Sequence, residues 1–141
     1  MNSFPEAEKE AVRNEVIARF NQLVVALNWK DARAWSEFYS EDEFISAVAG
    51  TDYYGVRSAW VDAITGYFST RERQRVEPVR VRVTPIDPNL ALMTSEEKSE
   101  MSFEGGEEIE SRHVFTMIWK NGKGGWKILH SHESWIDEQV K

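Results

Sequence analysis

The first half of the chain repeats apolar residues at intervals of three and four positions, which is the spacing of amphipathic helices. The longest such stripe consists of Val12, Val16, Phe20, Leu23, Val24 and Leu27. A second stripe begins after Asp31 with Trp35, Phe38 and Tyr39, and a third extends from Val56 to about Thr70 with Trp60, Ile64, Tyr67 and Phe68. The pattern therefore predicts a long helix that ends near Asn28, followed by two shorter helices.

From Arg75 onwards the apolar period changes to two, which is the period of strands. Four stretches of this kind, at about 75–84, 90–103, 108–119 and 126–135, are separated by short turns rich in Gly, Pro and Asn. A further short strand is predicted at 44–48, and residues 51–55 are predicted as a loop. Helices placed early and a meander placed late predict one α+β domain over residues 1–141. Its three N-terminal helices would pack on a strongly curved, mostly antiparallel sheet, which encloses a cone-shaped cavity.

Composition narrows the classes of function. The 141 residues carry a net charge of −7, so we expect neither a nucleic acid nor an anionic membrane as a partner. The absence of Cys excludes disulfides, thiolate metal sites and Cys nucleophiles. We find no signal peptide at the N-terminus and no stretch of the roughly 20 apolar residues that a membrane span needs. We therefore expect a cytoplasmic soluble domain. The six Trp predict a core or pocket built from large flat side chains.

The last strand, at 126–135, is the most informative stretch for function. Strict alternation places one set of side chains on a single face: Trp126, Ile128, His130, His132 and Ser134. This face begins apolar and ends with two imidazoles and a hydroxyl, a pattern typical of a strand that runs from a packed core into a cavity. We therefore predict that His130 and His132 lie at the polar end of the cavity.

Three sequence features resemble a known family. They are the segment 26–31 between the first two helices, Tyr54-Gly55 before the third, and the closing pattern Gly-x-Trp-x-Ile-x-His-x-His-x-Ser from Gly124 to Ser134. Together with the element order they resemble the NTF2-like superfamily, with the closest similarity to SnoaL-like domains and to the association domain of calmodulin-dependent kinase. The resemblance covers nearly the whole chain and implies a cystatin-like cone. It does not imply one activity, because this scaffold hosts enzymes, binding proteins and oligomerisation modules.

The ketosteroid isomerases, which share that fold, offer a test of one activity. The resemblance places their oxyanion-hole Tyr at Leu23 and their general-base Asp at Ala47. Neither side chain can donate or accept a proton, so ketosteroid isomerase activity is disfavoured.

The resemblance also implies that Arg112, on the penultimate strand, reaches the cavity. Arg offers a planar fork of donors that suits a carboxylate. We therefore predict a pocket that binds a small hydrophobic or carboxylate-bearing molecule and is lined by Arg112, His130, His132, Tyr39, Tyr54, Trp60 and Trp35. The alternatives are that Arg112 pairs internally with a carboxylate such as Glu97 or Glu110, that the histidines only cap the core, and that the aromatic residues are ordinary core.

Two functions fit this prediction. The first is a small-molecule-binding domain without an assigned activity. The second is an enzyme similar to the SnoaL-like cyclases, isomerases or hydratases, in which His132, or else His130, acts as the base while a Tyr hydroxyl or Arg112 steadies an enolate. A metal would need a third ligand such as His113 or Glu97, and we expect neither a metal nor another cofactor. A purely oligomerising module is a third possibility, which has no use for two imidazoles and an Arg in a cavity.

The same face assignment predicts a homodimer. If Arg112 faces the cavity, then Phe115, Met117 and Trp119 lie on the convex face of the sheet, where a second copy would cover them. A β-bulge that inverts the faces is the alternative. The acidic runs 95–100 and 107–110 are interpreted as solvated strand edges without a catalytic role.

Overall fold

The computed structural model describes residues 4–139. Its helices and strands follow in the order α1 (Glu6–Asn28), α2 (Ala32–Ser36), β1 (Ser46–Ala49), β2 (Asp52–Tyr54), α3 (Arg57–Thr70), β3 (Arg71–Asp87), β4 (Leu90–Phe103), β5 (Glu108–Gly122) and β6 (Gly125–Gln139). None of the helices within these residues combines the length and hydropathy that a membrane span requires.

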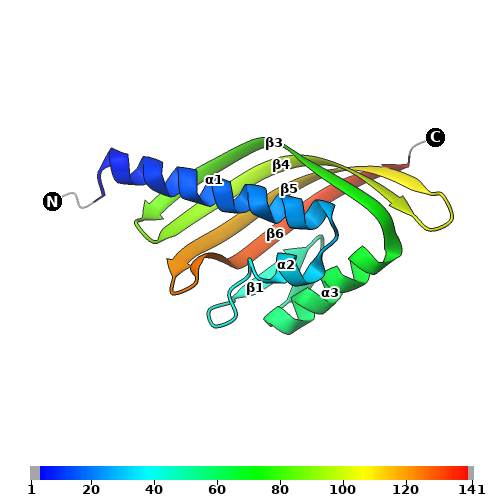
Figure 1. The fold of residues 1–141 in the computed structure, drawn as a ribbon, viewed down its shortest axis with the longest axis horizontal. Helices are drawn as coiled ribbons and strands as arrows, with labels where there is room; N and C mark the ends of the chain where they lie inside the picture. The colour runs from blue at the N-terminus through cyan, green and yellow to red at the C-terminus, as the bar shows by residue number, and fades with distance from the viewer. Residues whose placement is uncertain (1–3, 140–141) are drawn as a thin grey trace.

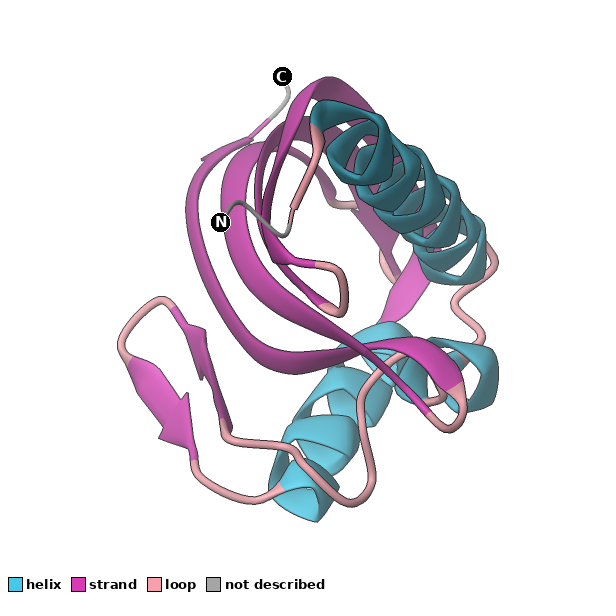
Figure 2. Cartoon of the chain, turned by 90° about the vertical axis from the view of Figure 1, so that its left-hand side faces the viewer, coloured by secondary structure: helices cyan, strands magenta, loops and turns pink. Residues whose placement is uncertain are grey.

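The strands form one six-stranded sheet in the order β2-β1-β6-β5-β4-β3. All neighbours are antiparallel except β1 and β6, which run parallel. The long strands β3 to β6 curl strongly, α1 lies along β3, and α2 and α3 lie on the β1 side of the sheet (Figures 1 and 2). The predicted α+β cone is therefore confirmed. The stretch predicted as a loop contains β2, which forms a short hairpin with β1.

The core lies between α1 and the concave face of the sheet. The predicted stripe of α1 is buried from Val12 to Val24, and it meets sheet residues that are fully inaccessible to solvent: Ala91, Met93, Trp119 and Ile128. Each large apolar side chain buried in this way contributes roughly 1.5–3 kcal/mol to folding. The stripe fixes the helix on the sheet and so defines which face of each strand is internal.

A β-bulge in β6 changes the side on which its C-terminal half presents its side chains. Ile118 of β5 pairs with His130, whereas Trp119 pairs with Ile128, so Leu129 is an extra residue. The carbonyl of Leu129 accepts a hydrogen bond from the backbone N–H of Ile45 at 2.7 Å, which ties the bulge to the segment before β1. Beyond the bulge, the odd-numbered residues of β6 face inwards and the even-numbered ones face outwards.

The face assignment predicted for β6 from strict alternation is therefore wrong beyond Ile128, where the bulge reverses it. The predicted faces of β5 are also inverted, although β4 and β5 pair without a register shift. On β5, Phe115, Met117 and Trp119 are 7%, 4% and 0% exposed and belong to the core, while Arg112 is exposed. These three apolar residues cannot form the convex surface on which the homodimer was predicted. The interpretation of residues 95–100 as a solvated edge is also wrong for every second residue, because Glu97 is only 2% exposed.

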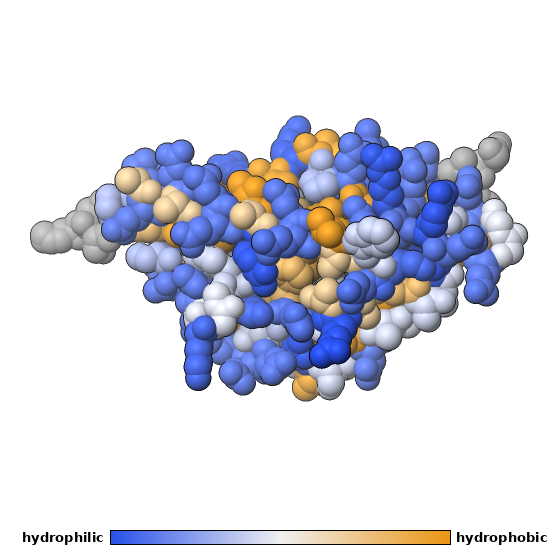
Figure 3. All heavy atoms as spheres, viewed as in Figure 1, coloured by the Kyte–Doolittle hydropathy of each residue, from blue (hydrophilic) through white to orange (hydrophobic). Residues whose placement is uncertain are grey.

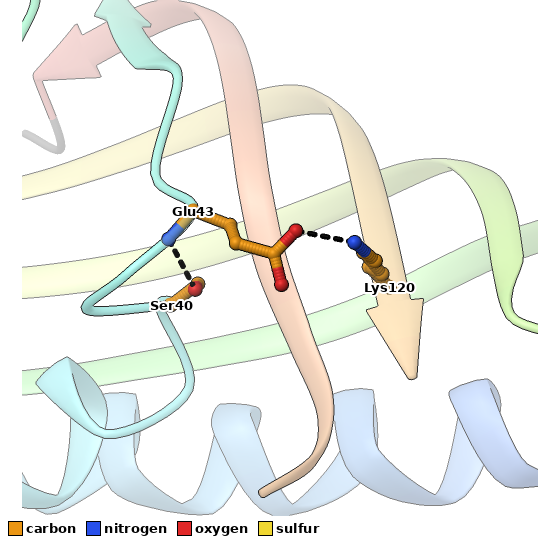
Figure 4. Close-up of polar contacts among 3 residues, drawn as sticks. All are labelled: Ser40, Glu43 and Lys120. Atoms are coloured by element: carbon orange, nitrogen blue, oxygen red, sulfur yellow. Dashed lines mark hydrogen bonds and ion pairs between the residues drawn. The ribbon is translucent and has the colours of Figure 1, made fainter. Parts of the chain in front are cut away.

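The loop between α2 and β1 is attached to the end of β5. The Ser40 hydroxyl accepts a hydrogen bond from the Glu43 backbone N–H at 2.9 Å, and the Glu43 carboxylate pairs with Lys120 (Figure 4). These contacts hold the loop against the end of the sheet that carries the β5–β6 turn. The opposite end, at the β4–β5 turn, is where the pocket described next is found.

Candidate functional site

A pocket of about 590 Å³ lies where the end of α1 meets the start of β3 and the β4–β5 end of the sheet. Trp29, which is 79% exposed, stands at its rim, and Gln74, Met101 and Ile109 contribute from the three strands. In the space-filling view, apolar side chains gather along α1 and in the hollow below it (Figure 3). The buried Gln74 and Met101 belong to the inward face of the sheet, so one wall of the pocket borders the concave side.

Polar side chains continue inwards from this pocket along β4 and β5. Ser99 follows Met101 on the same face of β4, and Ser111 follows Ile109 on the same face of β5. We name as the polar patch the five inward-facing residues Ser95, Glu97, Ser99, Ser111 and His113. The register pairs Ser99 with Ser111 and Glu97 with His113, so the five residues are contiguous. Their burial is high, with Glu97 and Ser111 each 2% exposed.

Most polar atoms of the patch lack a hydrogen-bond partner among the described residues. Ser99 Oγ and His113 Nε2 are 3.0 Å apart and form its one hydrogen bond between side chains. Both Glu97 oxygens, the hydroxyls of Ser95 and Ser111, and His113 Nδ1 are buried without a partner in residues 4–139. Because buried polar groups in folded proteins are nearly always hydrogen-bonded, such a cluster is a candidate for binding a polar partner.

Burial changes the protonation of the two ionisable groups in the patch. It raises the pKa of Glu97 to about 7, with the charges of Glu133 and Glu96 acting in the same direction. The Ser95 hydroxyl opposes this shift, although it lies outside hydrogen-bond geometry. Burial lowers the pKa of His113 to about 4, an effect that Asp137 opposes. At neutral pH the imidazole is therefore uncharged and Glu97 is partly protonated.

Glu133 lies on the inward face of β6, opposite Phe115. Its side chain is half-buried, and no described residue hydrogen-bonds to its carboxylate. Burial raises the pKa of Glu133 to about 7, against the opposing effect of Arg71. Arg71, the first residue of β3, donates to Gln74, and its own pKa is lowered by burial while the charges of Glu133 and Asp137 raise it. Glu133 is thus an accessible carboxyl with a cation in its vicinity.

Four of the predicted site residues, Trp35, Tyr39, Tyr54 and Trp60, come together as an aromatic cluster. The ring centroids of Trp35 and Tyr39 are 4.9 Å apart, and those of Tyr54 and Trp60 are 5.2 Å apart. Trp35, Tyr39 and Trp60 are at most 3% exposed, so their packing is that of a core. The Tyr39 hydroxyl donates to Ser131 Oγ at 2.9 Å.

The aromatic cluster and Glu133 are neighbours. Burial raises the pKa of Tyr54 to about 12, and the charge of Glu133 contributes to this shift. Burial also raises the pKa of Tyr39, again with a contribution from Glu133. The charge of Glu133 therefore acts on both tyrosine hydroxyls, and the charge of Arg71 acts on Glu133.

The other three predicted site residues lie on the opposite face of the sheet. Arg112 and His132 are exposed, and His130 is half-buried with its Nδ1 2.9 Å from Ser46 Oγ. The thickness of the sheet separates these side chains from the aromatic cluster, so the prediction that they line the cavity is wrong. The physical reason is the bulge at Leu129, which turns His130 and His132 outwards.

Sequence reasoning did not assign the inward-facing groups to the site. Glu97 was interpreted as part of a solvated edge or as an ion-pair or metal partner, and Glu133 and Arg71 were given no role. A signal for Glu97 exists, because Ala91 and Met93 begin a two-residue alternation that continues through Glu97 to Met101. Within residues 4–139, no group of three or more His, Asp and Glu side chains is arranged to hold a metal ion.

Comparison with known proteins identifies the family. A family model described as a SnoaL-like domain matches residues 16–138. The chain belongs to the SnoaL-like family. No curated protein sequence matches this SnoaL-like chain.

Solved structures share the SnoaL-like chain's fold at low sequence identity. A proposed scytalone dehydratase from Novosphingobium aromaticivorans superposes with a TM-score of 0.85 at 9% identity, over 97% of this chain and 94% of that one. A hexachlorocyclohexane dehydrochlorinase from Novosphingobium barchaimii gives 0.80 at 10% identity, over 96% and 94%. A proposed calcium/calmodulin-dependent kinase II association domain from Xanthomonas campestris gives 0.75 at 15% identity, over 86% of each chain. These similarities establish the NTF2-like cone.

Proposed function

We propose that this SnoaL-like chain binds a small, mostly apolar molecule inside the cone and moves a proton on it, with Glu133 as the base. The observation that carries the proposal is that Glu133 lies on the inward face of β6, opposite the buried Phe115, where its charge acts on Tyr39 and Tyr54 and that of Arg71 acts on it. The proposal keeps the predicted aromatic wall and replaces the predicted imidazole base, because His130 and His132 face outwards.

Glu133 has the properties that proton transfer requires. A base works best when its pKa is close to the working pH, and burial brings the pKa of Glu133 to about 7. The carboxylate is not engaged by a hydrogen bond from the described residues, so it can approach a C–H bond of a ligand. Removing that proton leaves negative charge on the ligand, which the Tyr54 hydroxyl or the Arg71 guanidinium would stabilise.

The reactions named for two structural neighbours are consistent with this chemistry. A dehydratase removes water and a dehydrochlorinase removes hydrogen chloride, and both eliminations take a proton from the substrate. Such a reaction can proceed with acid–base groups alone.

A general probe tests the base without knowledge of the natural substrate. A nitrobenzisoxazole loses its ring C–H proton to a base while its N–O bond breaks, and the product is a coloured cyanophenolate. We expect the wild-type chain to catalyse this opening with a rate that rises with pH through about 7, as Glu133 deprotonates. We expect Glu133→Gln to lower the rate roughly 100-fold. Glu138→Gln, an exposed change on the same strand, is the matched control.

Binding without chemistry is the second candidate, and the dense packing of the aromatic cluster favours it. If the wild-type chain opens the probe no faster than Glu133→Gln does, the pocket is a binding site only. Native mass spectrometry of the purified protein would then identify a retained small molecule directly.

A homodimer also stays a proposal, now on different residues. The outward face of the central strands exposes 48% of Val114 and 69% of Ile136, beside the half-buried Ile118. A second copy of the chain placed on this face would cover them. The same native mass spectrum reports the oligomeric state.

A further inference from the structure

We infer that the ligand of the proposed site carries a primary ammonium group, which the polar patch of β4 and β5 binds. The inference rests on the proposed function, since it assumes that a small molecule enters the cone. It assigns a role to buried groups that proton transfer by Glu133 does not use.

The polar patch offers acceptors in the number that an ammonium group needs. Its atoms without a partner among the described residues include two carboxylate oxygens of Glu97 and the hydroxyl oxygens of Ser95 and Ser111. His113 adds the lone pair of Nδ1 when its Nε2–H donates to Ser99 Oγ. An ammonium group has three donors and no acceptor, so it can satisfy several of these atoms at once. A carboxylate would bring only acceptors.

The charges near Glu97 also favour a cation. The groups that shift its pKa besides burial are the Ser95 hydroxyl and the carboxylates of Glu133 and Glu96, and none of them is positive. Arg71 is not among them, although its charge acts on Glu133 and on His113 of the same patch. A buried carboxylate without a counter-charge is costly, and a ligand cation beside it removes that cost. The net charge of −7 attracts cations to the molecule as a whole.

A flat aromatic surface next to the patch suits the apolar part of such a ligand. Trp135 stacks on His113 with a centroid distance of 6.2 Å and an interplanar angle of 28°, and it is 37% exposed. Gly50 lies against the other edge of Trp135, where an added Cβ would be 3.1 Å from the ring. Met101, between the pocket and Ser99 on β4, has the flexible side chain that an access route requires.

An organic ammonium fits the patch better than a metal ion does. Glu97 and His113 are the only carboxylate and imidazole of the patch, and no described set of three such ligands exists. Two ligands with serine hydroxyls make a weak metal site, whereas they match the tetrahedral donors of an amine.

Three probes of nearly equal shape test the inference: benzylamine, benzyl alcohol and benzoate, each titrated calorimetrically into the purified chain. We expect benzylamine to bind at least about tenfold more tightly than benzyl alcohol, because charge-assisted hydrogen bonds are the strong ones. We expect benzoate not to bind measurably. Glu97→Gln should weaken benzylamine roughly tenfold or more and leave benzyl alcohol within about twofold.

The control is Glu138→Gln, an exposed carboxylate of β6 whose charge is not among those that act on Glu97. It should leave the affinity for all three probes unchanged. If Glu97→Gln does not fold, Ser111→Ala tests the same patch with a smaller change and should weaken benzylamine alone.

Two results would overturn the inference. The first is that benzyl alcohol or benzoate binds as tightly as benzylamine. The second is that neither Glu97→Gln nor Ser111→Ala changes the affinity for benzylamine. The opening of the neutral nitrobenzisoxazole separates this failure from a failure of the proposed function. If the nitrobenzisoxazole is opened in a Glu133-dependent way but benzylamine binds no more tightly than the other probes, only the ammonium inference is wrong. If the nitrobenzisoxazole is not opened and none of the three titrated probes binds, the proposed function is wrong as well.

Discussion

The two faces of the sheet carry the same pair of side chains in different surroundings. On the inside, Ser99 Oγ lies 3.0 Å from a nitrogen of His113, and on the outside Ser46 Oγ lies 2.9 Å from a nitrogen of His130. The inner pair is next to Glu97, which is 2% exposed and has no partner among the described residues, and burial lowers the pKa of His113 to about 4. The outer row around His132 is open to water. The surroundings of a histidine, rather than its presence, therefore indicate the face on which we propose the chemistry.

The largest expected effect on stability comes from placing a charge on the inner side of β5, and the same charge on the outer side is its counterpart. Trp119 is fully buried, so Trp119→Glu loses roughly 3–5 kcal/mol of packing and adds the cost of a buried carboxylate. We expect most of this variant to be unfolded, since domains are stable by only about 5–15 kcal/mol. Val114→Glu, on the outer face, should keep the fold and turn the proposed dimer into a monomer. Circular dichroism melts and native mass spectra check both, and a folded Trp119→Glu would contradict the assignment of faces.

Glu97→Gln sharpens the comparison through the dependence of stability on pH. Burial raises the pKa of Glu97 from 4.5 to about 7, so the folded state binds its proton more tightly than the unfolded chain does. The contribution of Glu97 to stability is therefore full below pH of about 4.5 and is lost as pH rises to about 7. The shift corresponds to roughly 3 kcal/mol, which the variant should gain over wild type near pH 8 and not near pH 4.

The measurement is urea unfolding of both proteins across this range of pH. Glu133 and His113 titrate in both, so the difference between the two curves isolates Glu97. Glu138→Gln should follow wild type at every pH, because its exposed carboxylate is not among the groups that act on Glu97. Parallel curves for Glu97→Gln and wild type would show that Glu97 is not held in a low-dielectric site.

The fold could be predicted from the sequence because its elements are long and strictly periodic. The stripe from Val12 to Leu27 indicates α1, and the change of period near Arg75 indicates the meander. The strand β2 was missed because Asp52–Tyr54 is too short to show a period. The local pattern is therefore sufficient for long elements only.

The site could be predicted only in part, for two physical reasons. Leu129 is apolar and fits either side of the sheet, so nothing in the sequence marks it as the bulge residue that reverses the faces of β6. Glu97 was misjudged because its charge suggested exposure, although the alternation between Met93 and Met101 placed it inside. The proximity of Arg71 to Glu133 depends on the curvature of the whole sheet, which local patterns do not encode.

Gly50→Ala tests the inner wall with an intermediate effect. Gly50 has a φ of 63°, which costs a residue with a Cβ roughly 1–2 kcal/mol, and the new methyl would press on the ring of Trp135 at 3.1 Å. We expect a loss of that size in stability and weaker stacking of Trp135 on His113, which tryptophan fluorescence reports.

Gly66→Ala is the matched control, because nothing lies within 4 Å of its added Cβ. In the middle of α3 it should stabilise the chain by up to about 1 kcal/mol. Equal changes in stability and fluorescence for the two variants would show that the position of the Trp135 ring does not depend on the missing Cβ of Gly50.

The smallest expected effect on turnover comes from substitutions on the outer face of the sheet. These substitutions test most directly which face carries the reactive groups. His132→Ala removes an exposed imidazole that the bulge turns away from the cone, so we expect the opening of the nitrobenzisoxazole to change by less than about twofold. Ser46→Ala removes the partner of His130 and should cost roughly 0.5–1.5 kcal/mol of stability, again without an effect on the rate. A loss of turnover in His132→Ala comparable to that in Glu133→Gln would mean that the reactive groups are on the outer face. In that case ligand binding alone would explain the inner carboxyls, and the base would be an imidazole of the outer face.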